Sequence, residues 1–155
     1  MNIILTRPLN DTENLMNELF NLGHKIMHVP TLKITSANIE PLNIKNYNAL
    51  VFTSSNAVKN LQVIGEKKNI RCFCVGSVTE KVARLSGFSN TISASGNVNA
   101  LKNLIINSKE LKKNDKLAYI CGDQITLELD KELGKEGFKV KKIINYFSEK
   151  ITTLN

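Results

Sequence analysis

Short apolar runs alternate along the chain with longer segments of helical period. Most runs are followed by a cluster of Gly, Ser, Thr or Asn and then by a stretch whose apolar positions recur at helical spacing. This alternation predicts a parallel α/β fold, because parallel strands need a crossover segment between them. The predicted strands are Ile3–Leu5, Ile26–Val29, Ala49–Phe52, Arg71–Val75, Asn90–Ile92, Leu117–Cys121 and Val140–Ile144. The predicted helices are Asp11–Leu22, Asn56–Gly65, Thr79–Ser86, Asn97–Asn107 and Gln124–Gly137.

The periodicity also divides the chain into domains. It fades over residues 35–46, where Pro41 interrupts the pattern, and we expect a linker there. Residues 47–146 then supply enough strands and helices for one complete doubly wound domain with a parallel, flavodoxin-like sheet. Residues 1–34 supply only the start of a similar domain, which is incomplete because two strands leave their apolar faces in water. The polar residues 147–155 are expected to form a return linker.

Composition limits the class of protein. With 42% hydrophobic and 23% charged residues, the chain is typical of a globular protein. No apolar run approaches the roughly 20 residues that cross a bilayer, and the start lacks the features of a signal peptide, so we expect a cytoplasmic protein without a membrane partner. Cys72, Cys74 and Cys121 suit neither a disulfide framework nor a zinc site, and we expect them to be small buried residues. His24 and His28 have no ligand cluster beside them, so no metal is expected.

The net charge of +7 raises the question of an anionic partner. Basic doublets occur at Lys67-Lys68, Lys112-Lys113 and Lys141-Lys142, but no aromatic residues are interleaved with them to stack on bases. We therefore expect no nucleic-acid partner. Two interpretations stay open: the lysines form an ordinary solvated surface, or their summed field attracts polyanionic small molecules.

The chain has no Walker loop, no dinucleotide-binding glycine motif and no nucleophile elbow, so the candidate chemistry rests on strand ends. In a parallel sheet these ends share one edge, where the free N–H groups and dipoles of helix starts favour an anion. The same residue types are ordinary helix caps, so capping alone stays an alternative for each cluster. The clusters are Thr6-Arg7-Pro8, Thr53-Ser54-Ser55-Asn56, Gly76-Ser77-Val78-Thr79, Ser95-Gly96-Asn97 and Cys121-Gly122-Asp123.

Taken in order, several segments resemble the uroporphyrinogen-III synthase family. The similarity spans nearly the whole chain, and each motif is weak alone but specific in this order. The matching segments are Ile4-Leu5-Thr6-Arg7-Pro8, Leu22-Gly23-His24, Leu50-Val51-Phe52-Thr53-Ser54-Ser55-Asn56, Cys74-Val75-Gly76-Ser77-Val78-Thr79, Leu85-Ser86-Gly87, and Ile120-Cys121-Gly122 leading to Tyr146.

The resemblance implies two flavodoxin-like domains joined by a two-stranded linker, with the first domain completed by a C-terminal segment. We expect this chain to lack that segment, which leaves its activity alone in doubt. The resemblance further implies a monomer at full length, whereas a truncated chain could form oligomers. An alternative function is a non-catalytic anion-binding or interaction module of the same fold.

The implied reaction cyclises hydroxymethylbilane to uroporphyrinogen III, with loss of water and inversion of the last ring, and needs no cofactor. By this resemblance Tyr146 is the candidate general acid, although an aromatic residue packed at a strand end is the alternative. The candidate residues for binding substrate carboxylates are Arg7, Thr53, Ser54, Ser55, Asn56, Gly76, Ser77, Thr79 and Gly122. The chain departs from the family pattern after Gly122, where Asp123-Gln124-Ile125-Thr126 stands in place of a basic residue.

Overall fold

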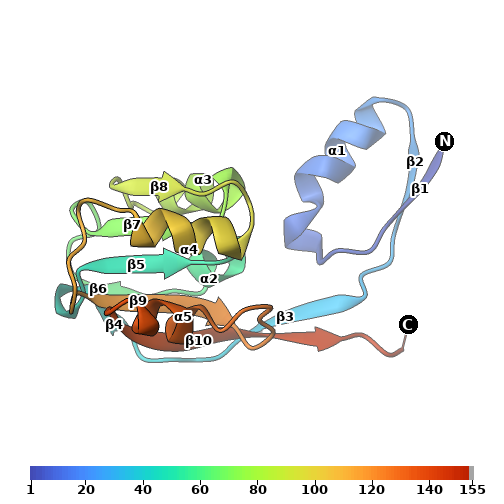
Figure 1. Ribbon diagram of the computed structural model, residues 1–155. Coiled ribbons are helices and arrows are strands. Elements are labelled where there is room, and N and C mark those ends of the chain that lie inside the picture. Colours follow the sequence, from blue (N-terminus) through green and yellow to red (C-terminus); the bar gives the residue numbers. More distant parts are fainter. Residues whose placement is uncertain (154–155) are drawn as a thin grey trace. The chain divides into compact units, whose positions relative to one another are not determined.

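The computed structural model describes residues 1–153 and divides into two units (Figure 1). Unit 1 comprises Met1–Thr35 and the residues from Ser148 on, whereas unit 2 is the continuous segment Ser36–Phe147. The chain therefore passes between the units twice.

A parallel sheet forms the centre of unit 2. Its spatial order is β8-β7-β5-β9-β10, with β3 added beyond β10. The strands are β3 (Leu32–Ser36), β5 (Ala49–Phe52), β7 (Arg71–Cys74), β8 (Thr91–Ser93), β9 (Lys116–Gly122) and β10 (Lys139–Lys150). The pairs β5–β7, β5–β9, β7–β8 and β9–β10 are all parallel. The predicted α/β fold with a mostly parallel sheet is therefore confirmed.

The flavodoxin-like detail is not confirmed. Numbered along the chain, the five parallel strands lie in the order 3-2-1-4-5. A flavodoxin sheet has the order 2-1-3-4-5, whereas 3-2-1-4-5 belongs to the other common doubly wound arrangement. Hydrophobic patterning could not distinguish them, because both orders bury every strand on two faces and give the same apolar runs.

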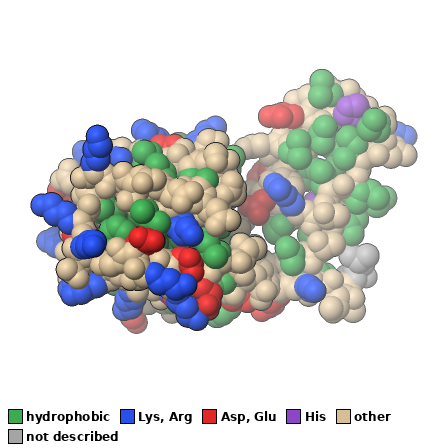
Figure 2. Space-filling view, in the orientation of Figure 1, with side chains coloured by type: hydrophobic (Ala, Val, Ile, Leu, Met, Phe, Trp, Pro, Cys, Tyr) green, Lys and Arg blue, Asp and Glu red, His purple; other side chains and the backbone are tan. Residues whose placement is uncertain are grey.

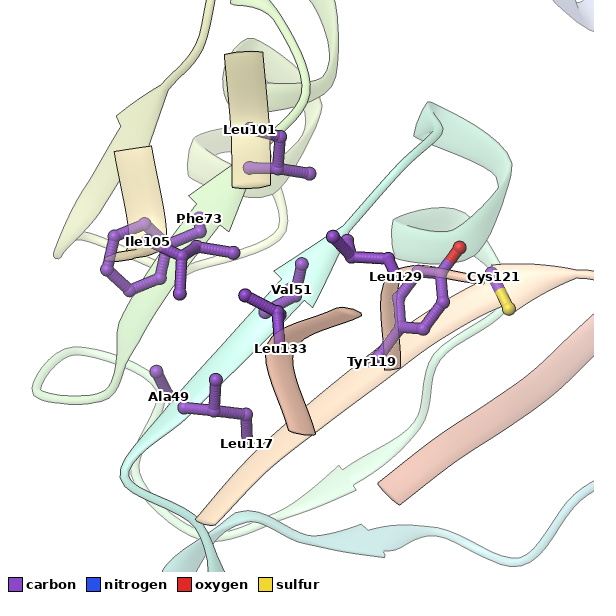
Figure 3. Packing of buried hydrophobic residues seen from close by; sticks show 10 residues of the cluster. All are labelled: Ala49, Val51, Phe73, Leu101, Ile105, Leu117, Tyr119, Cys121, Leu129 and Leu133. Atoms are coloured by element: carbon purple, nitrogen blue, oxygen red, sulfur yellow. The ribbon is translucent and has the colours of Figure 1, made fainter. Parts of the chain in front are cut away.

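Two pairs of helices cover the two faces of this sheet. One face, which includes Val51, Phe73 and Tyr119, packs against α4 (Val98–Ile106) and α5 (Leu129–Lys135) through Leu101 and Leu133 (Figure 3). The alternate strand residues form the opposite face, covered by α2 (Ser55–Lys59) and α3 (Ser77–Leu85). Right-handed crossovers explain the arrangement. From β5 the chain adds β7 and β8 on one side of the sheet, with α2 and α3 as crossovers, and it then adds β9 and β10 on the other side, so that α4 and α5 cover the opposite face.

Helix α3 is attached to β8 by a carboxylate. Glu80 accepts hydrogen bonds from Ser93 Oγ at 2.6 Å and from Thr91 Oγ1 at 2.9 Å. Arg84, one turn further along α3, forms an ion pair with Glu80 at 3.1 Å. The hydrogen bonds from Ser93 and Thr91 hold the pKa of Glu80 below its ordinary value, because they stabilise the charged carboxylate.

Two helix predictions were too long. The helix predicted to reach Gly65 ends at Lys59, and Val63–Ile64 instead forms β6, which pairs with β4 (Leu42–Asn43). Helix α5 begins at Leu129 rather than Gln124. The segment predicted as a linker, residues 35–46, contains β4, a short 3-10 helix η2 (Ile44–Asn46) and the end of β3.

Unit 1 contains few elements. Strands β1 (Asn2–Leu5) and β2 (Lys25–His28) pair in parallel, and they are connected through a short 3-10 helix η1 (Leu9–Asp11) and α1 (Glu13–Asn21). Among residues 1–153, every buried apolar side chain belongs to unit 2, and α1 buries none.

Strands β3 and β10 carry the chain between the units. Ala37 N donates to Asn145 O at 3.0 Å, and Ile151 N donates to Thr31 O at 2.9 Å. Residue numbers rise along one strand as they fall along the other, so the two strands are antiparallel, as Figure 1 also shows.

All three cysteines are free and buried, as predicted. Burial raises the pKa of each thiol, to about 12 for Cys74, so the thiolate form is suppressed at neutral pH. No helix in residues 1–153 is long and apolar enough to span a bilayer.

Candidate functional site

Several candidate residues lie at the carboxyl edge of the unit 2 sheet. Because β5, β7, β8 and β9 are parallel, the turns that follow them lie at the same edge. The strand order reverses between β5 and β9, from which the chain departs in opposite directions. In open α/β sheets such a switch point is where the crevice for a ligand forms. The residues nearest to it are Thr53 after β5 and Gly122 at the end of β9.

A hydrogen bond between two hydroxyl groups lies at this switch point. Ser54 Oγ and Tyr146 Oη are 2.7 Å apart, although 92 positions separate them in the sequence. Ser54 Oγ also accepts a hydrogen bond from Ala57 N at 3.2 Å and thereby caps α2. The capping alternative is thus correct for Ser54, but it does not exclude a second role, because a hydroxyl can accept and donate at the same time.

Gly122 provides the space that the Tyr146 ring occupies. A Cβ atom at Gly122 would lie 2.5 Å from Tyr146 Cε2 and Cζ, closer than non-bonded atoms approach. Gly122 is also buried and paired with Tyr146 in the sheet. The structure therefore explains this glycine by close packing of the phenol, and offers no support for the predicted contact with substrate carboxylates.

A β-bulge sets the direction of the Tyr146 side chain. Ile144 pairs with Cys121 and Tyr146 with Gly122, so Asn145 is an extra residue in β10 without a partner in β9. Side chains normally alternate between sheet faces, which would place Tyr146 on the face of Ile144. The extra residue moves Tyr146 to the face of Gly122, where Ser54 lies.

The side chains of Thr53 and Ser54 lie on different faces of the sheet. Thr53 lies against Tyr119, whose pKa is raised by burial and lowered by a smaller amount by the Thr53 side chain. Ser54 lies on the other face and bonds Tyr146. Ser55 and Asn56 are half-buried in the first turn of α2.

The start of α3 presents free backbone donors. Its N-cap is Gly76, which has no side chain to cap the helix, and Ser77 is exposed. A Cβ at Gly76 would lie 3.2 Å from Gly96 Cα, so the turns after β7 and β8 touch at this point. Thr79 is only 4% exposed, so its predicted contact with substrate is not supported.

Arg7 belongs to unit 1. Its carbonyl oxygen lies 2.8 Å from His28 Nε2, which links the turn after β1 to the end of β2. The Arg7 side chain is exposed. This supports a structural role for His28, as expected.

Sequence reasoning missed Asn145. It is 0% exposed, and Asn145 Nδ2 donates to Ala57 O at 2.7 Å, joining β10 to α2. A signal was present in the sequence, since an amide stands directly after the apolar run that ends at Ile144. A buried amide requires partners, so this position was a candidate for a special contact.

A second polar feature lies at the amino edge of unit 2. An open cavity of about 460 Å³ is lined by Lys116, Lys139, Lys141, Asn46 and Tyr47, together with Val140. Lys139 is the register partner of Lys116, so two ammonium groups start on neighbouring strands at directly opposed positions. Like charges in such positions repel each other unless solvent or an anion screens them.

These features define a class: an α/β protein with a doubly wound parallel sheet and a tyrosine–serine pair at its switch point. The family model described as uroporphyrinogen-III synthase HemD matches residues 13–154. The chain therefore belongs to the uroporphyrinogen-III synthase family. The predicted family resemblance is confirmed.

Solved structures support the fold. The uroporphyrinogen-III synthetase of Helicobacter pylori 26695 is 18% identical, with a TM-score of 0.59, and the match covers 99% of this chain and 63% of that chain. A mutant uroporphyrinogen III synthase of the extremely thermophilic bacterium Thermus thermophilus is 12% identical, with a TM-score of 0.60, and the match covers 97% of this chain and 64% of that one. This chain thus spans less than two thirds of the structures it matches. No curated protein matches it.

Proposed function

We propose that this chain forms part of an enzyme that cyclises hydroxymethylbilane to uroporphyrinogen III, with loss of water and inversion of the last ring. Family membership supports the reaction, and one observation supports its place in the molecule: the phenol of Tyr146 is held by Ser54 at the switch point of the sheet. Because the chain spans 63–64% of the solved relatives, the activity is proposed for the protein that contains it.

Tyr146 is proposed as the general acid. A phenol with an ordinary pKa near 10 is protonated at neutral pH, so it can donate a proton to the leaving hydroxyl group. Either hydroxyl of the Ser54–Tyr146 pair can be the donor, and when Ser54 donates to the phenol oxygen, the phenol can donate its own proton to the substrate. Departure of water gives a cation that the bilane itself stabilises, and the remaining task is to hold the chain so that the correct carbon attacks.

Binding is proposed to rest on donors around the same edge. The free N–H groups at Gly76 and Ser77 start a helix of nine residues, and its dipole favours a carboxylate. The polar groups of Ser55 and Asn56 are further donors, and Thr53 and Arg7 of unit 1 stay candidates, although the Thr53 side chain contacts Tyr119 on the other face of the sheet. Thr79 and Gly122 are left out of this set, because both are buried.

The decisive experiment uses Tyr146→Phe, with Tyr47→Phe as a matched control at the amino edge. The chain, and any longer product of the same reading frame, is given hydroxymethylbilane, and the isomer III and isomer I products are separated after oxidation. We expect Tyr146→Phe to slow formation of isomer III by about 10²–10⁴, the usual contribution of a general acid. Tyr47→Phe should act as wild type. If neither form of the protein makes isomer III faster than buffer, the proposed function is wrong.

A second candidate function is supported by the lysine cavity. Lys116, Lys139 and Lys141 surround an open volume together with Tyr47, and no ion pair within residues 1–153 neutralises these three lysines. Figure 2 shows Lys and Arg side chains around this end of unit 2. A non-catalytic module would bind a small polyanion here. Tight binding of tripolyphosphate, abolished in Lys116→Gln/Lys139→Gln, in a protein that makes no isomer III would favour this candidate.

We also propose a cytoplasmic location. The three buried thiols of Cys72, Cys74 and Cys121 form no disulfide. A reducing compartment suits free cysteines.

A further inference from the structure

The carbonyl of Ala57 needs a partner from outside its own helix. Helix α2 contains only Ser55–Lys59, and the amide that would ordinarily bond Ala57 O, that of Leu61, donates instead to Val58 O at 3.2 Å. The last carbonyls of any helix lack intrahelical donors and must be satisfied elsewhere. Asn145 Nδ2 supplies the bond to Ala57 O at 2.7 Å.

The same residue fixes the strand that carries Tyr146. Asn145 is the extra residue of the bulge, and its own carbonyl accepts a hydrogen bond from Ala37 N of the segment after β3 at 3.0 Å. Its side chain is 0% exposed. Asn145 therefore connects α2, β10 and the segment after β3 at one buried point.

Three hydrogen bonds and the backbone between Asn145 and Tyr146 form a closed loop of bonds that includes the phenol hydroxyl. Tyr146 Oη bonds Ser54 Oγ, and Ser54 Oγ accepts from Ala57 N. Ala57 O accepts from Asn145, which is the chain neighbour of Tyr146. The position of the phenol thus depends on Asn145 by two routes, through the backbone of the bulge and through the first turn of α2.

From this closed loop of bonds we infer that Asn145 is a positioning residue for Tyr146. Asn145 sets the sheet face on which the Tyr146 side chain lies and the orientation of its hydroxyl group, both of which the proposed reaction uses. The catalytic part of this inference rests on the proposed function. The positioning part does not, because it can be observed without substrate.

The side-chain amide of Asn145 does more than fill space in the bulge. Asn145 Oδ1 is buried and has no hydrogen-bond partner among residues 1–153. Leaving a buried acceptor unpaired is unfavourable, and an apolar residue would avoid it. The donor to Ala57 O is therefore the function of the side chain that the geometry supports, and it can be tested by removing the donor while keeping the shape.

The test variant is Asn145→Asp, which keeps the shape and replaces the donor by an oxygen. At neutral pH two acceptors would face each other, so the bulge and α2 should separate. Burial raises the pKa of such a carboxyl, and once protonated it can donate to Ala57 O again. The defect should therefore be present at high pH and recover as the pH falls through the raised pKa of Asp.

Asn60→Asp is the matched control. Asn60 Nδ2 also donates to a carbonyl of α2, that of Asn56, at 2.8 Å, so the chemical change and the helix are the same. It has no bond to Ser54, Tyr146 or the bulge in the structure. Both variants should lose some stability, but only Asn145→Asp should change the environment of Tyr146.

The first readout is the ring resonances of Tyr146 in the chain labelled at tyrosine, assigned by their loss in Tyr146→Phe. We expect Asn145→Asp to shift them at pH 8 and to restore them toward wild type at low pH, with no shift in Asn60→Asp. Wild-type Tyr146 resonances in folded Asn145→Asp at pH 8 would overturn the inference. If Asn145→Asp does not fold, Asn145→Leu, which keeps the branched shape but has no donor, is measured in its place, and unshifted Tyr146 resonances in that variant would overturn the inference in the same way.

The second readout is the formation of isomer III by whichever form of the protein makes it. We expect Asn145→Asp to lower kcat by about tenfold to a hundredfold at pH 8 with little change in KM, since a misplaced group affects the transition state. Unchanged kcat with shifted Tyr146 resonances would overturn the catalytic part. Failure of wild type itself to make isomer III rejects the proposed function and leaves the resonance test of positioning unaffected.

Discussion

Unit 1 and unit 2 each place a pair of parallel strands beside a helix, but their apolar side chains have different surroundings. Phe73 of unit 2 is 1% exposed between β7 and its helices, whereas Phe20 of unit 1 is 71% exposed on α1. Two strands and one helix cannot exclude water from both sides of a sheet, so more elements are needed before burial becomes favourable. The comparison shows that similar local sequence patterns give a dry interior only when neighbouring strands are present.

The largest effect expected from this comparison is on folding stability. Phe73→Ala should lower the free energy of unfolding by about 3–5 kcal/mol, because it leaves a cavity between the sheet and α4. The same change at Phe20 should alter it by less than about 0.5 kcal/mol, since that ring is already in water. Urea unfolding followed by circular dichroism measures both. Equal losses would show that Phe20 is covered in solution and would remove the contrast.

A smaller effect is expected where unit 2 is packed most closely. Gly122→Ala should destabilise unit 2 by about 1–3 kcal/mol, because the added methyl group would overlap the Tyr146 ring. Gly134→Ala, in α5, meets nothing within 4 Å and should stabilise by about 0.5–1 kcal/mol through helix propensity. Thermal unfolding of the two variants gives the signs. A stable Gly122→Ala protein would mean that Tyr146 can leave its site at little cost.

The smallest effect concerns acid. The pKa of Glu80 is lowered in the folded state, so this carboxylate stabilises unit 2 above its ordinary pKa of 4.5, and the contribution is lost as the pH falls through the lowered value. Ser93→Ala should cost about 1.5 kcal/mol at pH 7, the low end for a hydrogen bond to a charged group, because Glu80 keeps Thr91 and Arg84 as partners. The difference from wild type should shrink toward pH 3. The control is Ser89→Ala, which changes an exposed serine between α3 and β8, and it should show no such pH dependence.

The strands and the edge that gathers the candidate residues could be predicted from sequence. Apolar runs at Ala49–Phe52 and Leu117–Cys121 correspond closely to β5 and β9, because a strand buried on both faces leaves a continuous apolar signature. The strand order could not be predicted, since the same runs suit either doubly wound arrangement. The length of α2 was also missed, because Val63 and Ile64 fit a helix by period but pair with β4.

The site was predictable only in part. Tyr146 and Ser54 could be named as candidates from the family resemblance, but neither their contact nor its cause was visible in the sequence. The contact depends on one extra residue in β10, and a bulge changes register without changing composition. For the same reason the sequence suggests substrate binding for Gly122, whereas in the structure Gly122 makes room for the Tyr146 ring. Long-range packing of this kind is decided by tertiary geometry and leaves no local pattern.

The hydrogen bond between Ala37 and Asn145 has a consequence for protein engineering. It joins a residue one position after the start of unit 2 to a residue two positions before its end, with 3.0 Å between Ala37 N and Asn145 O, so the two ends of this continuous segment lie close together. Such a segment can be removed as a cassette, transplanted into a surface loop of another protein, or closed into a ring and reopened elsewhere, because its ends already meet.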